Sequence, residues 1–178
     1  MVGSIKKKIG LFGGSFDPPH QGHLKISKIA IKKLLLDRLY WCVTKKNPFK
    51  SQTFFSLSSR INKSKLLTIK ERKIKVKYFE DKIKSNNSID LIKYLNKKHR
   101  KNEFFLILGS DNLINFHKWK NWKQLTRLIK IVVFSRKDYD VKAKKSAMIK
   151  QVKNIIFIKN KPIKISSTQI RKKLTYKF

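Results

Sequence analysis

The chain has very few of the residues that define several common protein classes. Its 178 residues include one cysteine, Cys42, so neither an internal disulfide nor a cysteine-rich zinc site is available. No apolar run approaches the roughly 18 residues that a membrane-spanning helix requires, and the apolar stretch after the basic N-terminus is too short for a secretory signal. We therefore expect a reduced, cytoplasmic protein that does not interact with membranes, with Cys42 as a small buried strand residue.

Acidic residues are also scarce. Ten Asp and Glu stand against 45 Lys and Arg, which gives a formal net charge of +35. Such an imbalance attracts polyanions and leaves a nucleic-acid-binding protein open as a hypothesis. The basic residues are mostly lysines spread along the whole chain, and lysine is poorly suited to bidentate recognition of phosphates and bases. We therefore interpret the charge as a compositional bias of the solvated surface and expect no specific nucleic-acid partner.

What the chain does contain is an alternation of short apolar runs and longer amphipathic stretches. The apolar runs predict buried strands at 9–12, 39–44, 104–109, 130–135 and 154–158. Apolar residues at helical spacing predict helices at 23–36, 56–69 and 88–99. This alternation is typical of an α/β fold, here a Rossmann-like, doubly wound parallel sheet. Since no linker or repeat interrupts the pattern, we expect a single domain over residues 1–178.

Ligands of such sheets bind beyond the carboxyl ends of the strands, and the stretch GGSFDPPHQGH (13–23) follows the first predicted strand. Gly13 and Gly14 allow close approach of a ligand and positive φ. A helix is expected to begin near His20, and a helix N-terminus attracts anions. His20 and His23, three residues apart, would share its first turn and contact the same phosphate. The alternative is a tight glycine turn with two partly exposed histidines; a metal site would need further ligands.

A second anion site is predicted near the other end of the chain, in ISSTQIRKKL (165–174). Ser166, Ser167 and Thr168 would cap and open a helix, and their hydroxyls and amides would face an anion. Arg171 lies one turn later, where its planar guanidinium can donate two hydrogen bonds to a phosphate. Considered as structure alone, the stretch is simply a good capping sequence.

Together the two motifs resemble those of the HxGH nucleotidyltransferases. GGSFDPPHQGH is especially similar to the signature of the bacterial nicotinate-nucleotide adenylyltransferases, and ISSTQIR is similar to their ISSTxIR motif. The resemblance spans residues 5–174 and implies transfer of an adenylyl group from ATP to nicotinate mononucleotide in NAD biosynthesis, giving nicotinate adenine dinucleotide and pyrophosphate. It implies His20, His23 and Arg171 as catalytic residues. It also implies an ATP site formed by Gly13, Gly14, Ser15, Phe16, Ser166, Ser167 and Thr168.

The same resemblance implies a mononucleotide site in the middle of the chain. Its candidate residues are Asn47 and Lys50 in VTKKNPFK, Ser88 in SIDLIKYL, and Gly109, Asp111 and Trp119 in LILGSDNLINFHKWKNW. Trp119 would line the pocket of the nicotinate ring, Asp111 would lie near the ribose, and Ser88 would contact the nicotinate carboxylate. From the residues alone, the alternative is that Trp119 and Trp122 are packing residues of a helix.

Three positions depart from the family's pattern. Lys45 occupies a place where relatives often have proline, and Ser88 and Leu91 occupy places where they often have threonine. Acceptor identity is therefore the weaker part of the resemblance, and a pantetheine-phosphate adenylyltransferase stays open as an alternative. So does a nucleic-acid-binding protein on the same fold. We expect Mg²⁺ held mainly by the ATP phosphates, since no carboxylate cage is evident, with no metal ligands from the chain. The choice between nicotinate and nicotinamide mononucleotides, and association of identical chains, are left open.

Overall fold

The protein is built on one fully parallel, six-stranded sheet with the strand order β3-β2-β1-β4-β5-β6. The computed structural model describes residues 6–46, 52–136, 139–146, 149, 151–152, 155–161, 163 and 165–175. The strands are β1 (Lys8–Gly14), β2 (Arg38–Val43), β3 (Ile74–Lys77), β4 (Glu103–Gly109), β5 (Lys130–Phe134) and β6 (Ile155–Ile158).

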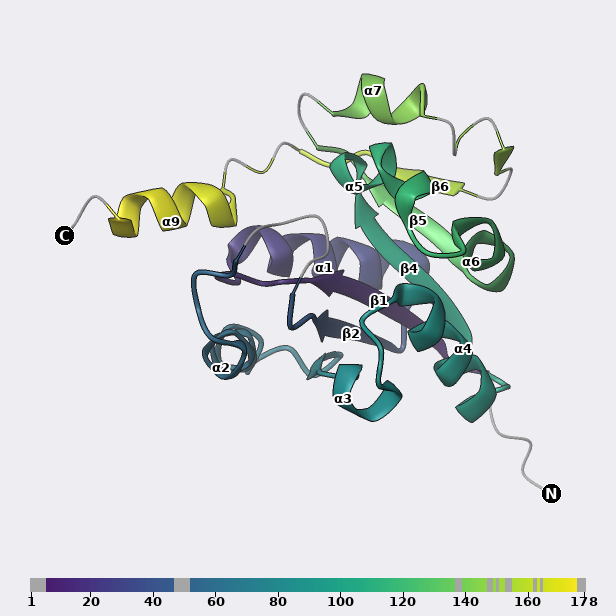
Figure 1. Cartoon of the computed structure of the whole chain (residues 1–178), viewed down its shortest axis with the longest axis horizontal. Coiled ribbons are helices and arrows are strands. Elements are labelled where there is room, and N and C mark those ends of the chain that lie inside the picture. The colour runs from purple at the N-terminus through teal and green to yellow at the C-terminus, as the bar shows by residue number, and fades with distance from the viewer. Residues whose placement is uncertain are drawn as a thin grey trace.

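Helices cover both faces of this sheet (Figure 1). One face is covered by α1 (Gln21–Leu34) and α2 (Leu57–Leu67). The opposite face is covered by α4 (Ser88–Lys98), α5 (Ser110–Ile114), the 3₁₀ helix η1 (Phe116–Lys118), α6 (Trp122–Leu128) and α7 (Asp140–Lys144). The short α3 (Glu80–Ile83) precedes α4, and α9 (Ser167–Thr175) lies apart from the sheet at one side of the molecule (Figure 1).

Alternation of side chains along the strands produces two separate cores. In β4, Phe105 and Ile107 pack with α1, whereas Phe104 and Leu106 pack with α4 and its neighbours. Successive residues of a strand point to opposite faces, and both faces of the central strands are covered, so these strands are apolar at nearly every position. Cys42 is buried, as expected from its place in β2.

The predicted fold class is confirmed, and all five predicted strands are present within two residues of their expected ends. One strand was missed. The sequence of β3 is IKVK, and only Ile74 in it is buried, because β3 lies at the edge of the sheet and exposes its lysines. A half-exposed strand of four residues lacks the continuous apolar run that identified the others.

Strand order reverses between β1 and β4, which lie side by side in the centre of the sheet. From β1 the chain proceeds outwards to β2 and β3, and from β4 it proceeds outwards to β5 and β6. At such a switch point the connections that follow the two strands diverge and leave room for a ligand at the carboxyl edge. This edge carries the turn after β1 and the start of α5.

Candidate active site

The turn between β1 and α1 brings its two histidines together. His20 is the N-cap of α1, with extended backbone (φ −149°), and its Nδ1 accepts a hydrogen bond from the Gly22 amide at 3.1 Å. The Nδ1 of His23 accepts one from the His20 amide at 3.2 Å. These reciprocal bonds form a capping box, and the centroids of the two imidazole rings lie 3.8 Å apart.

The hydrogen bonds also determine where the histidines carry their protons. An Nδ1 that accepts a hydrogen bond leaves the proton of a neutral imidazole on Nε2, so Nε2 is the donor in both rings. Burial, with a smaller contribution from the positive charge of Arg136, lowers the pKa of His20 to about 4. At neutral pH His20 is therefore an uncharged, oriented hydrogen-bond donor at the N-terminus of α1.

The backbone of the two glycines differs from our expectation of positive φ. Neither Gly13 nor Gly14 has positive φ; the residue in the left-handed region is Phe16, at φ 47°. Its ring is 2% exposed and stacks on Trp41 with centroids 4.7 Å apart, which holds the turn in this conformation. Only the backbone of Phe16 can therefore face a nucleotide. At Gly13 a Cβ would meet no atom within 4 Å, so its surface is open to a ligand.

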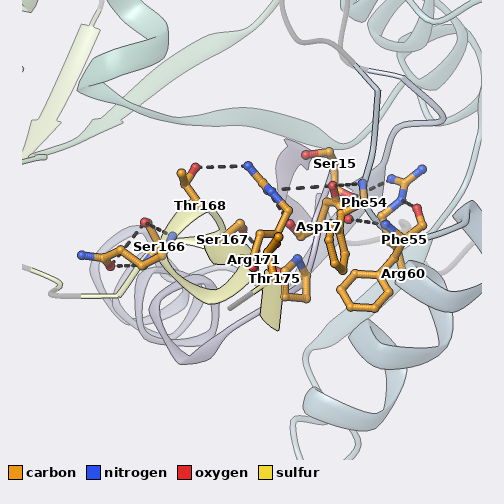
Figure 2. Close-up of polar contacts among 12 residues, drawn as sticks. Ser15, Asp17, Phe54, Phe55, Arg60, Ser166, Ser167, Thr168, Arg171 and Thr175 are labelled. Carbon is orange, nitrogen blue, oxygen red and sulfur yellow. Dashed lines mark hydrogen bonds and ion pairs between the residues drawn. The ribbon is translucent and has the colours of Figure 1, made fainter. Parts of the chain in front are cut away.

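The C-terminal motif meets this turn across 154 residues of sequence (Figure 2). The Nη1 of Arg171 donates to the Asp17 carbonyl oxygen at 2.6 Å, and its Nη2 donates to the Thr168 hydroxyl at 3.2 Å. The Ser167 hydroxyl donates to the Pro18 carbonyl at 2.9 Å. The two anion sites predicted from opposite ends of the chain are thus neighbours.

Ser166 takes the capping position that the sequence predicted. Its hydroxyl accepts a hydrogen bond from the Gln169 amide at 3.2 Å, and the Gln169 side chain accepts one from the Ser166 amide at 2.9 Å. This reciprocal pair satisfies amides at the start of α9 and makes its first turn regular. Ser166, Ser167 and Thr168 therefore lie together at the N-terminus of this helix.

A pocket lies on the α4 side of the turn, and of the predicted acceptor residues that the structure describes, Ser88 lines it whereas Gly109 and Asp111 do not. Its wall is formed by residues of β1, β2, β4 and α4 and by the segment 79–87 that precedes α4, with Gly13 and Ser88 among them. Within the part of the chain that the structure describes, two buried atoms of its lining have no hydrogen-bond partner, Thr44 Oγ1 and Glu80 Oε1. The pocket is thus an apolar cavity with isolated polar atoms, as is typical of small-molecule sites.

Glu80 also organises the rim of this pocket. Its second carboxylate oxygen accepts a hydrogen bond from the Lys45 amide at 3.1 Å. Burial raises the pKa of the Glu80 carboxyl, and the hydrogen bond from Lys45 opposes that increase. Lys45, which departs from the family's pattern, therefore contributes its backbone here, while its side chain is exposed.

Asp111 and Gly109 form a third part of the carboxyl edge. Gly109 is the N-cap of α5, and a Cβ there would collide with the carboxylate of Asp111. That carboxylate pairs with Arg136, with Oδ2 and Nη1 2.6 Å apart. Sequence reasoning missed Arg136, which follows β5 and approaches both Asp111 and His20. Its position directly after a predicted strand was the available signal.

The tryptophans do not share one helix, so that part of the sequence interpretation is wrong. Trp119 ends η1 with extended backbone, and Asn121, at φ 51°, separates it from α6, which begins at Trp122. The Trp119 ring stacks on Phe116 with centroids 4.8 Å apart and packs on the core beneath α6. Trp119 is not part of the pocket lining described above. Asn47 and Lys50 lie outside the described residues.

Among the described residues, no group of three or more His, Cys, Asp or Glu could hold a metal ion. In the same part of the chain, no helix is long and apolar enough to cross a membrane.

Comparison with known proteins identifies the class to which this site belongs. Residues 11–173 match the cytidylyltransferase-like family, and the chain belongs to that family. It is 48% identical over 169 residues to the probable nicotinate-nucleotide adenylyltransferase of Pelagibacter ubique, covering 94% of this chain and 93% of that protein. A probable nicotinate-nucleotide adenylyltransferase of Rhizobium leguminosarum is 40% identical over 129 residues, 72% of this chain and 67% of that one.

A solved structure agrees with the fold. The Plasmodium falciparum nicotinic acid mononucleotide adenylyltransferase complexed with APC superposes with a TM-score of 0.76 at 21% identity, covering 93% of this chain and 83% of that one. The identification made from the two motifs, as an enzyme of the nicotinate-nucleotide adenylyltransferase group of nucleotidyltransferases, is confirmed.

Proposed function

We propose that this protein, acting as one domain, transfers the adenylyl group of ATP to nicotinate mononucleotide and releases pyrophosphate in the cytoplasm. The observation that carries the proposal is the convergence of the two motifs: Arg171 and Ser167 of α9 bind the backbone of Asp17 and Pro18, directly before the histidine pair. This places two helix N-termini and a guanidinium around one turn, beside an apolar pocket. Such a site suits a polyphosphate next to a planar, partly apolar acceptor.

The reaction requires little covalent participation by the protein. A phosphate oxygen of the mononucleotide attacks the α-phosphorus of ATP in line, and the bond between that phosphorus and the bridging oxygen to the β-phosphate breaks. The protein must align the two phosphates and compensate the charge that develops on them. His20 and His23 serve this purpose by donating from Nε2, and the amides at the start of α1 add their partial positive charge.

Arg171 is proposed to bind the β- and γ-phosphates. Its hydrogen bonds to Asp17 and Thr168 fix the plane of the guanidinium, which carries five N–H donors in total. Ser166, Ser167 and Thr168 surround the α9 N-terminus, and Gly13, Gly14, Ser15 and Phe16 contribute backbone on the opposite side.

For the mononucleotide we propose the pocket bounded by Gly13 and Ser88. Ser88, at the first position of α4, would contact the nicotinate carboxylate, and Asp111 would lie near the ribose beside Gly109. The roles of Trp119 at the ring and of Asn47 and Lys50 at the phosphate stay predictions.

Mg²⁺ is proposed to enter with ATP. The described residues offer no cluster of metal ligands, so the donor set fits an ion that the phosphates themselves bind, with the chain supplying the surrounding positive groups. The ion would neutralise part of the triphosphate charge during the displacement.

The test is a pyrophosphate-release assay with ATP and three acceptors: nicotinate mononucleotide, nicotinamide mononucleotide and 4′-phosphopantetheine. We expect the highest kcat/KM with nicotinate mononucleotide and none above background with 4′-phosphopantetheine. Preference for 4′-phosphopantetheine would instead support the alternative acceptor, and no release with any of the three would reject the proposal.

A further inference from the structure

Arg60, near the start of α2, is a buried side chain that contacts both halves of the proposed site. Arg60 is 1% exposed, and its guanidinium donates four hydrogen bonds, all to backbone carbonyl oxygens. The acceptors are Phe55 from Nε at 3.1 Å, Ser15 and Thr44 from Nη1 at 2.6 and 2.7 Å, and Lys45 from Nη2 at 2.9 Å. Figure 2 shows Arg60 among Ser15, Phe55 and the neighbouring side chains.

These carbonyls belong to both sides of the proposed site. Ser15 is part of the turn after β1 that faces ATP, whereas Thr44 lines the acceptor pocket. The Thr44 amide donates to the Gly14 carbonyl at 3.0 Å, so the backbones after β1 and β2 stay paired beyond the strand ends. The Nη1 of Arg60 then donates both to the Ser15 carbonyl, after β1, and to the Thr44 carbonyl, after β2.

The segment at Thr44 and Lys45 is held from two directions. Arg60 binds both of its carbonyls, and Glu80 accepts from the Lys45 amide. Three of the four carbonyls bound by Arg60 lie in the connection between β2 and α2, and the fourth lies in the ATP turn. A displacement of this guanidinium would therefore shift the acceptor wall relative to the ATP turn.

Burying a guanidinium is costly unless all of its surroundings compensate the charge. Here burial lowers the pKa of Arg60, and the nearby carboxylates of Asp17 and Glu80 oppose that decrease by favouring the charged form. Lysine could not replace this arrangement, because a single ammonium has three donors and no planar fork. The site thus uses a charged group of fixed shape purely to bind backbone.

We infer that Arg60 is a positioning residue, which sets the acceptor wall at Thr44 and Lys45 against the ATP turn at Ser15 without itself contacting substrate. This inference rests on the proposed function, because it assigns the two segments to acceptor and nucleotide. If Arg60 has this role, replacing it should change the KM of the acceptor more than the KM of ATP.

The experiment compares Arg60→Lys and Arg60→Met with Arg127→Lys and Arg127→Met, at an exposed arginine of α6. We expect the KM of nicotinate mononucleotide to rise about tenfold or more in Arg60→Lys, the loss typical of a displaced bidentate contact, with the KM of ATP rising less than about threefold. The Arg127 variants should match the unaltered protein in both constants. Equal KM changes for both substrates, or a lower Tm with unchanged KM values, would overturn the inference.

A measurement on the unaltered protein covers the case in which neither Arg60 variant folds. The ¹⁵N-labelled Nε–H group of Arg60 should exchange slowly with water and shift when nicotinate mononucleotide is added. Rapid exchange of this proton with water, or a chemical shift that does not change when nicotinate mononucleotide is added, overturns the inference. The proposed function fails separately, if the unaltered protein releases no pyrophosphate with this acceptor.

Discussion

In the β1–α1 turn, the imidazoles of His20 and His23 cap α1, and in the proposed function they also face the substrates. Replacing His23 with Ala removes an oriented Nε2 donor and one half of the capping box. We expect kcat to fall about a hundredfold or more, since a preorganised donor to developing charge is worth roughly 3 kcal/mol. The lost capping bond should lower the unfolding free energy by only about 1 kcal/mol. Steady-state kinetics and thermal melts measure the two effects separately.

His99→Ala and His117→Ala are matched controls for this variant, because both residues are exposed, His99 at the end of α4 and His117 in η1. Their kcat should equal that of the unaltered protein. A His23→Ala protein with near-normal turnover would remove His23 from the proposed mechanism, whatever its melting temperature.

The pKa of His20 predicts a specific dependence of stability on pH. Its folded value is about 4, against 6.5 for an unperturbed histidine, so between these two values the unfolded chain binds the extra proton. The stability contributed by neutral His20 is therefore complete above pH 6.5, decreases as the pH falls towards 4, and changes no further below. Chemical denaturation across this range measures the decrease.

His20→Asn is the comparison for this titration, since asparagine can cap a helix but does not titrate. The unaltered protein should lose more stability than His20→Asn on acidification from pH 6.5 to 4. Parallel pH profiles would contradict the lowered pKa.

Among the secondary-structure elements, α9 depends on a few polar contacts for its place beside the active-site turn. Apart from the ion pair of Arg171 with the Asp17 carboxylate at 3.8 Å, these contacts bind backbone oxygens of the turn. Arg171→Lys keeps a positive charge but loses the planar fork, so the KM of ATP should rise about tenfold, or roughly 1.4 kcal/mol. The KM of the mononucleotide should change much less.

Lys172→Met is a suitable control for Arg171→Lys, because Lys172 is exposed on the same helix. Its kinetic constants should be unchanged. If Arg171→Lys also keeps the normal KM of ATP, a point charge is sufficient at this position. The proposed bidentate hydrogen bonds from Arg171 to the ATP phosphates would then be wrong.

Elements with strong local signals were predictable from the sequence, and those defined by tertiary context were not. The central strands are apolar on both faces and were located within two residues, whereas β3 exposes alternate lysines at the sheet edge. The alternative interpretation, with Trp119 and Trp122 as packing residues of one helix, was wrong about the helix, because Asn121 adopts left-handed backbone between them. Asparagine tolerates that conformation, which was the one local hint.

The same distinction applies to the site. His20, His23, Ser166 and Arg171 lie in contiguous motifs, so the sequence was enough to predict two local clusters, which the structure brings together; their roles in the reaction stay predictions. Arg60 was missed because its partners are four backbone carbonyls. Since every residue has a backbone carbonyl, no residue type in the sequence identifies these partners. The buried carboxylate of Asp17 likewise binds the amides of Phe54 and Phe55, from a segment 37 and 38 residues away.

For the molecule as a whole, the dominant physical property is its net charge of +35. A field of this sign attracts ATP and the mononucleotide, and it attracts any other polyanion as well. Because the lysines are dispersed, the attraction to nucleic acid should be a nonspecific effect of counterion release. Binding of a fluorescent single-stranded oligonucleotide should then weaken by about a hundredfold or more between about 50 and 200 mM salt.

Fluorescence anisotropy with two oligonucleotides of equal length and different sequence measures this dependence. We expect equal affinities for both and loss of binding at the higher salt, while pyrophosphate release continues with a raised KM for ATP, because substrate attraction is screened but the local contacts of α1 and α9 persist. Binding that stays tight at about 200 mM salt, or that distinguishes the two sequences, would contradict the interpretation of the lysines as a solvated surface. It would give this adenylyltransferase fold a second ligand of a different class.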